Sequence, residues 1–181
     1  MMQVTFQQFA EDEADALVDL ITSETWDYFV YANPTPDVVR DWIAKGWYSG
    51  DDNQVWWIVG AGGERAGIVR MHDLLDSTPQ LDFRIRAQCR GQGIGVQALR
   101  WATEHLFTML PEIQRIEGNT RQDNLAMRKT FRRCGYVKEA HYRSAWPTLD
   151  GARFDTIGYA ILRQDWQSGT TTAVAWDDEP E

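Results

Sequence analysis

The sequence predicts one α/β domain in which helices pack on a mixed sheet. Segments in which apolar and polar residues alternate, typical of strands, share the chain with segments that place apolar residues three and four positions apart, typical of helices. Their order is strand, two helices, three strands, helix, strand, helix and two strands, which favours a sheet that is partly antiparallel and partly parallel. The chain has 181 residues, of which 43% are hydrophobic, a size and composition that suit one globular domain.

The first elements are a strand and two helices. Residues 4–9 (VTFQQF) alternate and predict a strand, and residues 11–24 place apolar side chains at helical spacing behind an acidic first turn. Residues 33–46 predict a second helix with Thr35 as its N-cap, Pro36 in the first position and Gly46 at its end.

The remaining elements follow the same two patterns. Strands are predicted as a hairpin within residues 54–74 and at residues 81–85, 113–119, 136–146 and 153–162, and helices at residues 96–110 and 124–134. The domain is expected to span residues 1–166. Residues 167–181 lack periodicity and are expected to form a mobile acidic tail.

Charge is distributed unevenly along the chain. The net charge is −9, yet residues 84–133 hold ten basic side chains against four acidic ones, whereas residues 1–60 hold eleven acidic side chains against two basic ones. An acidic protein with one basic segment is a poor general nucleic-acid binder, because affinity for phosphates grows with the cations presented. The basic segment suits one bound anion, although solvated helix faces would give the same count.

Composition also argues against a membrane, secreted or metal-binding protein. The first residues lack the basic and apolar regions of a secretory signal, and the longest apolar run is far shorter than the ~20 residues that span a bilayer. We therefore expect a cytoplasmic protein with no membrane partner. Cys89 and Cys134 form no disulfide framework, and the three histidines are too scattered for a metal site, so no metal is expected.

Residues 89–99 (CRGQGIGVQAL) are the most informative stretch. Gly91, Gly93 and Gly95 directly precede a helix, where main-chain N–H groups lack partners and the missing Cβ atoms let an anion approach. The stretch therefore predicts a site for a diphosphate, and the alternative is a turn that binds nothing. Neither the nucleotide P-loop nor the dinucleotide fingerprint fits, since no Lys-Ser/Thr pair follows and Val96 stands where the fingerprint needs glycine.

A family resemblance sharpens this prediction. The residues QCRGQGIGVQAL resemble the acyl-CoA pyrophosphate loop of the GCN5-related N-acetyltransferase (GNAT) family, with Arg90, Gly93 and Gly95 in matching places. The segment IEGNTRQDNLAMRKTFRRCGYV is similar to the family's second motif, with Asn124 and Tyr136 in matching places. The segments NPTPDVVRDWI and RFDTIGYAILRQDW resemble the RimJ/RimL-type branch, which acetylates protein N-termini and small amines.

The resemblance implies an acetyl-CoA-dependent N-acetyltransferase with a GNAT-like α/β fold, in which about seven strands are flanked by about four helices. It also implies a set of residues that bind acetyl-CoA. In chain order the set is Phe83, Ile85, Arg86, Arg90, Gly91, Gln92, Gly93, Ile94, Gly95, Val96, Asn124 and Arg128. The glycine loop would hold the diphosphate, the strand edge at residues 83–86 would pair with the pantetheine amides, and Asn124 would lie beside the pantetheine or thioester end.

Two arginines of the basic segment, Arg121 and Arg128, could meet the 3′-phosphate of the cosubstrate, although exposed helix arginines are commonly only solvated. The mechanism implied is direct attack of the amine on the thioester in a ternary complex. Cys89 is not expected to form a covalent intermediate, because the loop faces the diphosphate rather than the acyl group.

One position departs from the family pattern. Phe131 stands where family members often have a tyrosine that protonates the leaving thiolate. The proton would then come from water or from another hydroxyl, for which Tyr136 is the candidate. Asp82 and Asp155 are candidates for the base that accepts the proton of the amine, and a structural role explains either aspartate more readily.

The acceptor amine is expected to bind at Trp26 and Tyr31, which lie in an aromatic cluster beside Glu24 and Asp27. Such a cluster suits a cationic or flat molecule, and packing between two helices is the alternative. A protein N-terminus, a polyamine and an amine-bearing antibiotic all remain open as acceptors, and a homodimer is compatible with the sequence. Two other functions also remain open: a non-catalytic acyl-CoA sensor on the same scaffold, and an interaction protein whose loop binds nothing.

Overall fold

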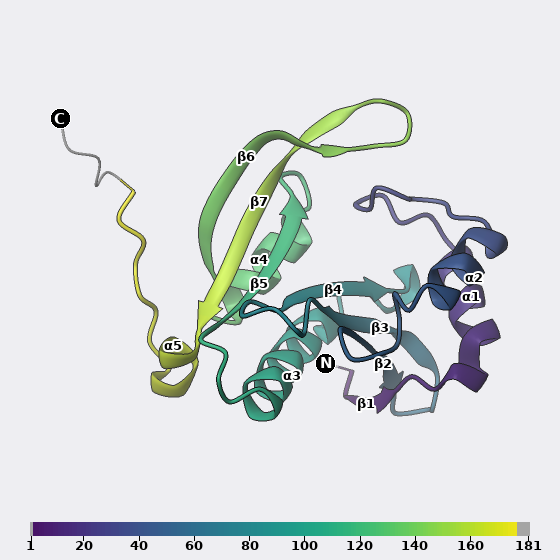
Figure 1. Cartoon of the computed structure of the whole chain (residues 1–181), viewed down its shortest axis with the longest axis horizontal. Helices are drawn as coiled ribbons and strands as arrows, with labels where there is room; N and C mark the ends of the chain where they lie inside the picture. Colours follow the sequence, from purple (N-terminus) through teal and green to yellow (C-terminus); the bar gives the residue numbers. More distant parts are fainter. Residues whose placement is uncertain (1, 177–181) are drawn as a thin grey trace.

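Seven strands form one sheet in the order β1-β2-β3-β4-β5-β7-β6 in the computed structural model, which describes residues 2–176 (Figure 1). The strands are β1 (Val4–Gln8), β2 (Asn53–Gly60), β3 (Arg65–His72), β4 (Gln80–Ile85), β5 (Arg115–Arg121), β6 (Val137–Pro147) and β7 (Arg153–Leu162). β4 and β5 run parallel, and the other neighbouring strands pair antiparallel. The predicted mixed sheet is therefore confirmed.

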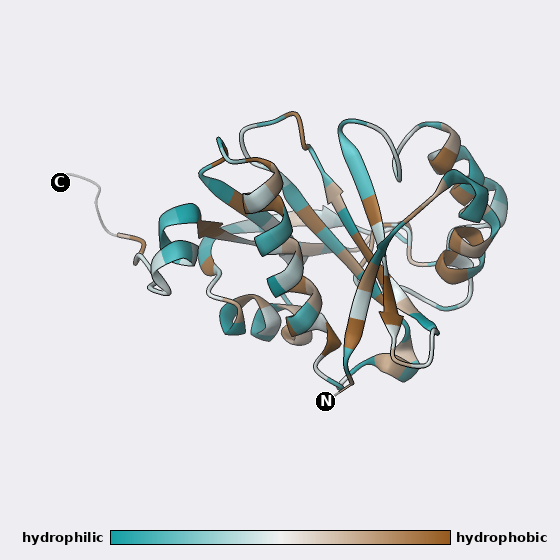
Figure 2. Cartoon of the chain, turned by 90° about the horizontal axis from the view of Figure 1, so that it is seen from below, coloured by the Kyte–Doolittle hydropathy of each residue, from teal (hydrophilic) through white to brown (hydrophobic). Residues whose placement is uncertain are grey.

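Helices cover both faces of this sheet. They are α1 (Ala14–Thr22), α2 (Pro36–Ala44), α3 (Ile94–Met109), α4 (Leu125–Arg133) and α5 (Arg163–Ser168), with short 3₁₀ turns at Glu11–Glu13 and Ala87–Cys89. One buried cluster joins α1 and α2 to β2 through Leu17, Val39 and Trp57. A second joins α3 and α4 to the opposite face through Leu99 and Phe131. In Figure 2, hydrophobic residues run along the central strands between these two helix layers.

Capping residues stand at helix ends that the sequence predicts. The Thr35 hydroxyl oxygen accepts a hydrogen bond from the Val38 amide at 3.4 Å and caps α2, and Gly46 follows that helix with φ +75°. Gly135 follows α4 with φ +84°. The left-handed backbone at both positions favours glycine, because a Cβ atom would be strained there.

The C-terminal segment contains a helix that the sequence analysis does not predict. α5 (Arg163–Ser168) crosses the expected domain boundary at residue 166, and the carboxylate of Asp165 in this helix accepts hydrogen bonds from the amide and hydroxyl of Thr172 at 2.8 and 2.7 Å. Residues 169–176 have no regular structure, and the part of the expected tail at residues 177–181 lies outside the described residues. The mobility of the tail stays a prediction. Between residues 2 and 176, no helix is long and apolar enough to cross a membrane.

The strand β4 occupies the position on which the site depends. It pairs with β3 along its whole length but with β5 only at Gln80 and Glu117, after which β4 and β5 diverge (Figure 1). Side chains alternate along a strand. Asp82 and Arg84 therefore face the α1/α2 side, whereas Phe83 and Ile85 face the α3/α4 side. One strand thus contributes to cavities on both faces of the sheet.

Candidate active site

A cleft of about 340 Å³ lies beside the N-terminus of α3, and we call it the glycine-loop cleft. Apolar side chains of β4 form one wall, the loop before α3 forms the end, and α4 forms the other wall. Its lining includes Phe83, Ile85, Arg90, Gly91, Gly93, Gly95, Val96, Asn124, Met127, Lys129 and Arg133. The cleft thus combines apolar walls with several cations at a helix N-terminus.

The main chain of the loop is arranged to bind an anion. Gly91 and Gly93 have φ +76° and +83°, and Gly93 is the N-cap of α3. Among the described residues, the amides of residues 91–96 have no main-chain or side-chain acceptor. Six neighbouring free N–H groups at the positive end of a sixteen-residue helix form a strong site for a phosphate or diphosphate.

A side-chain clamp holds this loop against β4. The Arg90 guanidinium donates to the carbonyl of Ile85 and to the carboxylate of Glu24, both at 2.8 Å. The same carboxylate accepts a hydrogen bond from the Ala87 amide at 2.9 Å. Glu24 therefore positions the loop, and it is not available to attract a cationic acceptor as the sequence analysis expects.

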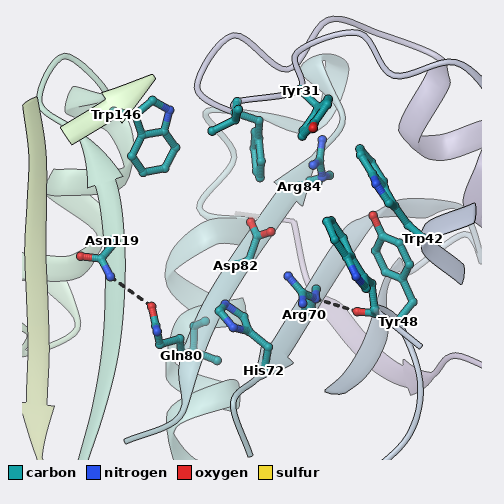
Figure 3. Close-up of a pocket in the computed structure, with 14 residues that line it drawn as sticks. Tyr31, Trp42, Tyr48, Arg70, His72, Gln80, Asp82, Arg84, Asn119 and Trp146 are labelled. Atoms are coloured by element: carbon teal, nitrogen blue, oxygen red, sulfur yellow. Dashed lines mark hydrogen bonds between the residues drawn. The ribbon is translucent and has the colours of Figure 1, made fainter. Parts of the chain in front are cut away.

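A second cavity, of about 300 Å³, lies on the other face of β4, and we call it the aromatic pocket (Figure 3). Its aromatic lining residues are Phe29, Tyr31, Trp42, Trp47, Tyr48 and Trp146. Its polar lining residues are Arg70, His72, Gln80, Asp82, Arg84 and Asn119. The rings of Trp42 and Trp47 stack at 5.2 Å, and the Tyr31 ring meets Trp42 edge-on at 5.2 Å, so the wall formed by the α1/α2 region is rigid and apolar.

Charged groups on the floor of the aromatic pocket are partly removed from water. Arg84 is only 7% exposed and its guanidinium lies 3.7 Å from the centre of the Phe29 ring. Burial lowers the pKa of the Arg84 guanidinium, and the neighbouring Asp82 carboxylate opposes that shift. Burial also raises the pKa of Tyr48 to about 12, so this phenol stays protonated at neutral pH. The pocket therefore presents cationic and neutral donors together with the Asp82 carboxylate.

A bulge in β6 places Trp146 over the pocket. The pairing with β7 is irregular between Tyr142 and Trp146, and Ser144 has φ +54°. The Asp155 carboxylate stabilises this bulge, because it accepts hydrogen bonds from the Ser144 amide at 2.8 Å and pairs with His141 Nε2 at 2.7 Å. These two partners, the Ser144 amide first, lower the pKa of Asp155. Asp155 thus supports the hairpin, and the geometry argues against it as a catalytic base.

A small cavity of about 70 Å³ connects the two sites where β4 and β5 diverge, and we call it the junction. It shares Asp82 and Trp146 with the aromatic pocket and Phe83 and Asn124 with the glycine-loop cleft. Tyr28 lines both the junction and the glycine-loop cleft. Ligands that enter from opposite faces of the sheet can therefore meet at this opening.

Comparison with known proteins assigns this architecture to a family. A family model described as an acetyltransferase (GNAT) domain matches residues 3–137. The chain belongs to the GNAT acetyltransferase family. The family predicted from the two motifs is therefore confirmed, and the enzyme class is acetyltransferase. The RimJ/RimL-type branch stays a prediction.

Solved structures show the same fold. A spermidine N-acetyltransferase from Vibrio cholerae in complex with CoA and spermine is similar with a TM-score of 0.76 and 16% identity, over 91% of this chain and 98% of that one. A probable acetyltransferase gives 0.74 and 19% identity over 90% and 94%. The predicted GNAT fold with a seven-stranded mixed sheet is confirmed, with five α-helices in place of about four.

Most of the predicted cosubstrate residues of this GNAT domain lie together. The glycine-loop cleft is lined by nine of them, namely Phe83, Ile85, Arg90, Gly91, Gly93, Ile94, Gly95, Val96 and Asn124. The side chain of Asn124 itself caps α4, since its Oδ1 accepts a hydrogen bond from the Met127 amide at 3.1 Å. Their binding role stays a prediction.

Three predicted cosubstrate residues do not line the cleft. Arg86 donates to the Ser23 hydroxyl at 3.0 Å, and Gln92 donates to the Gln88 carbonyl at 3.0 Å. Arg128 donates to the carbonyl of Gln122 at 2.6 Å. Each side chain is thus engaged within the protein.

Arg121, the other arginine considered for the 3′-phosphate, is also engaged within the protein. It is 9% exposed and pairs with both carboxylate oxygens of Asp123, at 2.8 and 2.7 Å. Besides Arg90, the cations that line the cleft are Lys129 and Arg133. Their spacing of four on α4 places them on one face, a signal that the sequence analysis did not use.

The two predicted catalytic residues, Asp82 and Tyr136, lie in different environments. Asp82 lines both the aromatic pocket and the junction. Tyr136 is 2% exposed in the core and its hydroxyl lies 2.8 Å from that of Thr103, and burial raises its pKa. The geometry therefore argues against Tyr136 as a proton donor. Tyr28 is the phenol that does line the junction, and no catalytic role is predicted for it from the sequence.

Phe131 packs in the core against β5 and β7 and also lines the junction. Its ring is 1% exposed and stacks on Tyr159 at 4.8 Å. Its Cζ atom lies 2.4 Å from the place that a Cβ atom on Gly118 would occupy, so the para position faces β5. Of the two predicted acceptor residues, Tyr31 lines the aromatic pocket, whereas Trp26 donates to the Ile21 carbonyl at 2.7 Å and lines the glycine-loop cleft.

Proposed function

We propose that this GNAT domain is an acetyl-CoA-dependent N-acetyltransferase that transfers an acetyl group to a primary amine of a small molecule or peptide. The observation that carries the proposal is the meeting of two different cavities at the β4–β5 junction. One offers free amides and cations, and the other offers aromatic rings and a carboxylate. This arrangement supports direct attack in a ternary complex, because both substrates can be present at once.

The glycine-loop cleft fits the cosubstrate. The free amides of residues 91–96 would hold the diphosphate, and Lys129 and Arg133 would add positive charge. Phe83 and Ile85 would contact the pantetheine chain along the unpaired edge of β4. When bound, acetyl-CoA supplies the activated acetyl group at the junction.

On the acceptor side, Asp82 would accept a proton from the ammonium form of the amine, directly or through water, which frees the nitrogen lone pair for attack on the acyl carbon. The carbon–sulfur bond then breaks with its electron pair on sulfur, and the acetylated nitrogen releases its second proton to water. Tyr28, which lines the junction, would donate a proton to the leaving sulfur in place of the tyrosine that Phe131 replaces. Tyr28 is 38% exposed, so water could return its proton.

A titration with CoA and acetyl-CoA tests the cosubstrate site. The Gly93→Val variant forces a β-branched side chain into a left-handed backbone among the free amides, so we expect affinity to fall by at least about tenfold, or 1.4 kcal/mol. Gly63→Val is the matched control. Gly63 has the same φ of +83° in the β2–β3 turn, with no atom within 4 Å of the added Cβ.

Binding by the wild type and by Gly63→Val, with loss in Gly93→Val, would support the proposal. Thiol release from acetyl-CoA with a panel of primary amines then tests transfer. Binding without thiol release for any amine would favour the acyl-CoA sensor instead. Absence of binding by the wild type would overturn the proposal.

A further inference from the structure

Two buried hydrogen-bond donors in the aromatic pocket have no acceptor. Within residues 2–176, neither Nη1 of Arg84 nor Nε1 of Trp146 has a hydrogen-bond partner, and water does not reach either atom. The two side chains come from β4 and β6, and both line the aromatic pocket (Figure 3). Buried donors without partners cost free energy, so two in one cavity indicate a ligand that supplies acceptors.

Of the two unpartnered donors, Arg84 is the stronger indication of a ligand. Its side chain is more than nine-tenths buried, and no carboxylate of the described residues forms an ion pair with it. Phe29 and Trp26 lie 3.7 and 5.2 Å from its guanidinium, measured to their ring centres. Aromatic rings hold the flat group in place but provide no acceptor in its plane, where its N–H groups point.

The second arginine of the pocket, Arg70, already has hydrogen-bond acceptors within the protein. Arg70 donates to the Trp47 carbonyl and to the Asn53 side chain, both at 2.7 Å. Asp82 lies opposite Arg70 in the strand register and two residues from Arg84 on the same face. It pairs with neither arginine, so the pocket presents one unused cation and one unused carboxylate.

These groups match the two ends of a zwitterion. We propose that the acceptor is an amine that also carries an anionic group, a carboxylate or a phosphate, and that Arg84 and Trp146 bind this group while Asp82 binds the amine. The inference rests on the proposed function and names its substrate class. A guanidinium edge and an indole N–H are suitable donors for either anion. Tyr31, Trp42 and Trp47 would contact the organic part of the molecule.

The same geometry disfavours a polyamine. A polyamine has several cations and no anion, so it would leave Arg84 and Trp146 unsatisfied and would bring positive charge toward a buried guanidinium. Charge repulsion and unpaired donors are the means by which a site rejects a wrong ligand. The aromatic pocket of this chain is therefore poorly suited to spermidine.

Acetylation rates for matched amines test the inference. Tyrosine is compared with tyramine, which lacks the carboxylate, and O-phosphoethanolamine with ethanolamine, which lacks the phosphate, and spermidine is the polyamine. We expect the wild type to prefer an anionic member by at least about tenfold in kcat/KM, and the preferred pair identifies which anion is bound. In Arg84→Gln this preference falls by at least about tenfold. Trp146→Phe, which removes only the N–H and some ring area, lowers it in the same direction by a smaller factor.

Acetyl-CoA binding is the folding control for both variants, because its cleft lies on the other face of β4. If Arg84→Gln fails to bind acetyl-CoA, Trp146→Phe alone decides the outcome. A wild type that binds acetyl-CoA but acetylates spermidine or the neutral amines faster, or that acetylates no anionic amine, overturns the inference. Unchanged preference in the folded variants also overturns it. Failure of the wild type to bind acetyl-CoA is a different result, which refutes the proposed function itself.

Discussion

The glycine-loop cleft and the aromatic pocket share one strand, yet they are built in opposite ways. The cleft presents main-chain amides from six consecutive residues, and its charged side chains sit at its rim. The pocket presents side chains from β3, β4, β5, β6 and the α1/α2 region, and one of its two arginines, Arg84, is buried in its floor. A main-chain site recognises a group common to many molecules, whereas a site of converging side chains can select one acceptor.

Under the proposed function, this contrast would let one domain combine a constant cosubstrate with a particular acceptor. Alternation along β4 sends Phe83 to the cleft and Asp82 to the pocket, so the two sites meet at the junction without sharing charged groups. Substitutions on one face should therefore leave the other face intact. A substitution that displaces β4 itself should weaken both the cleft and the pocket.

The largest effect is expected from Gly67→Ala. A Cβ atom at Gly67 would lie 2.1 Å from the Arg84 carbonyl oxygen, which is main chain and cannot move aside alone. Forcing β3 and β4 apart should lower the free energy of unfolding by about 3 kcal/mol and weaken both sites together. Denaturant unfolding and acetyl-CoA titration measure the two effects. In Gly62→Ala the new Cβ meets only the end of the Glu64 side chain, so this control should change neither.

Asp82→Asn should lower activity through the aromatic pocket without weakening acetyl-CoA binding in the glycine-loop cleft. The variant keeps the shape of the side chain but cannot accept a proton from the amine, so kcat/KM should fall by about 100-fold. Acetyl-CoA affinity should stay within about twofold, because the carboxylate faces the other side of β4. Steady-state kinetics and calorimetry provide the two values, with the exposed Asp19→Asn as control. Equal losses in both values would contradict the separation.

Glu24→Gln should weaken the cleft alone. The loss of charge removes the ion pair to Arg90, whose side chain is 48% exposed, and weakens the bond to the Ala87 amide. Because water screens such a pair, acetyl-CoA affinity should fall only about threefold to fivefold. Calorimetric titration checks this value, and Glu112→Gln, an exposed acid away from the cleft, serves as control. A loss above about 100-fold would mean that Glu24 has a larger role than holding the loop.

Asp155→Ala should have the smallest effect and should be confined to the pocket. Without its bond to the Ser144 amide the bulge loosens, and the KM for the acceptor should rise about threefold through Trp146. The pKa of Asp155 is lowered, so the stabilisation is present above the ordinary aspartate pKa and is lost as the pH falls through the lowered value. Thermal unfolding of the wild type and variant should therefore converge in acid. Ser144→Gly, which suits φ +54°, should retain wild-type KM.

Much of the fold could be predicted from local patterns. The caps at Thr35 and Gly46 and the alternation at residues 81–85 depend on neighbours in the chain, and the structure confirms the elements that they predict. The helix α5 has only six residues, which is too short for periodicity to indicate it. The sequence could not show, for a related reason, that the geometry argues against the catalytic roles considered for Tyr136 and Asp155. Burial against Thr103 and support of a bulge depend on partners that are distant in sequence.

The sequence by itself determined the glycine-loop cleft, because an anion site made of consecutive amides needs only glycines before a helix, and both are local. The aromatic pocket was decided by the tertiary structure. Arg84 and Trp146 are 62 positions apart, and neither indicates a ligand until the sheet opens between β4 and β5 and buries both donors in one pocket. Whether a polar side chain is satisfied depends on what the fold places around it, and no local pattern records that.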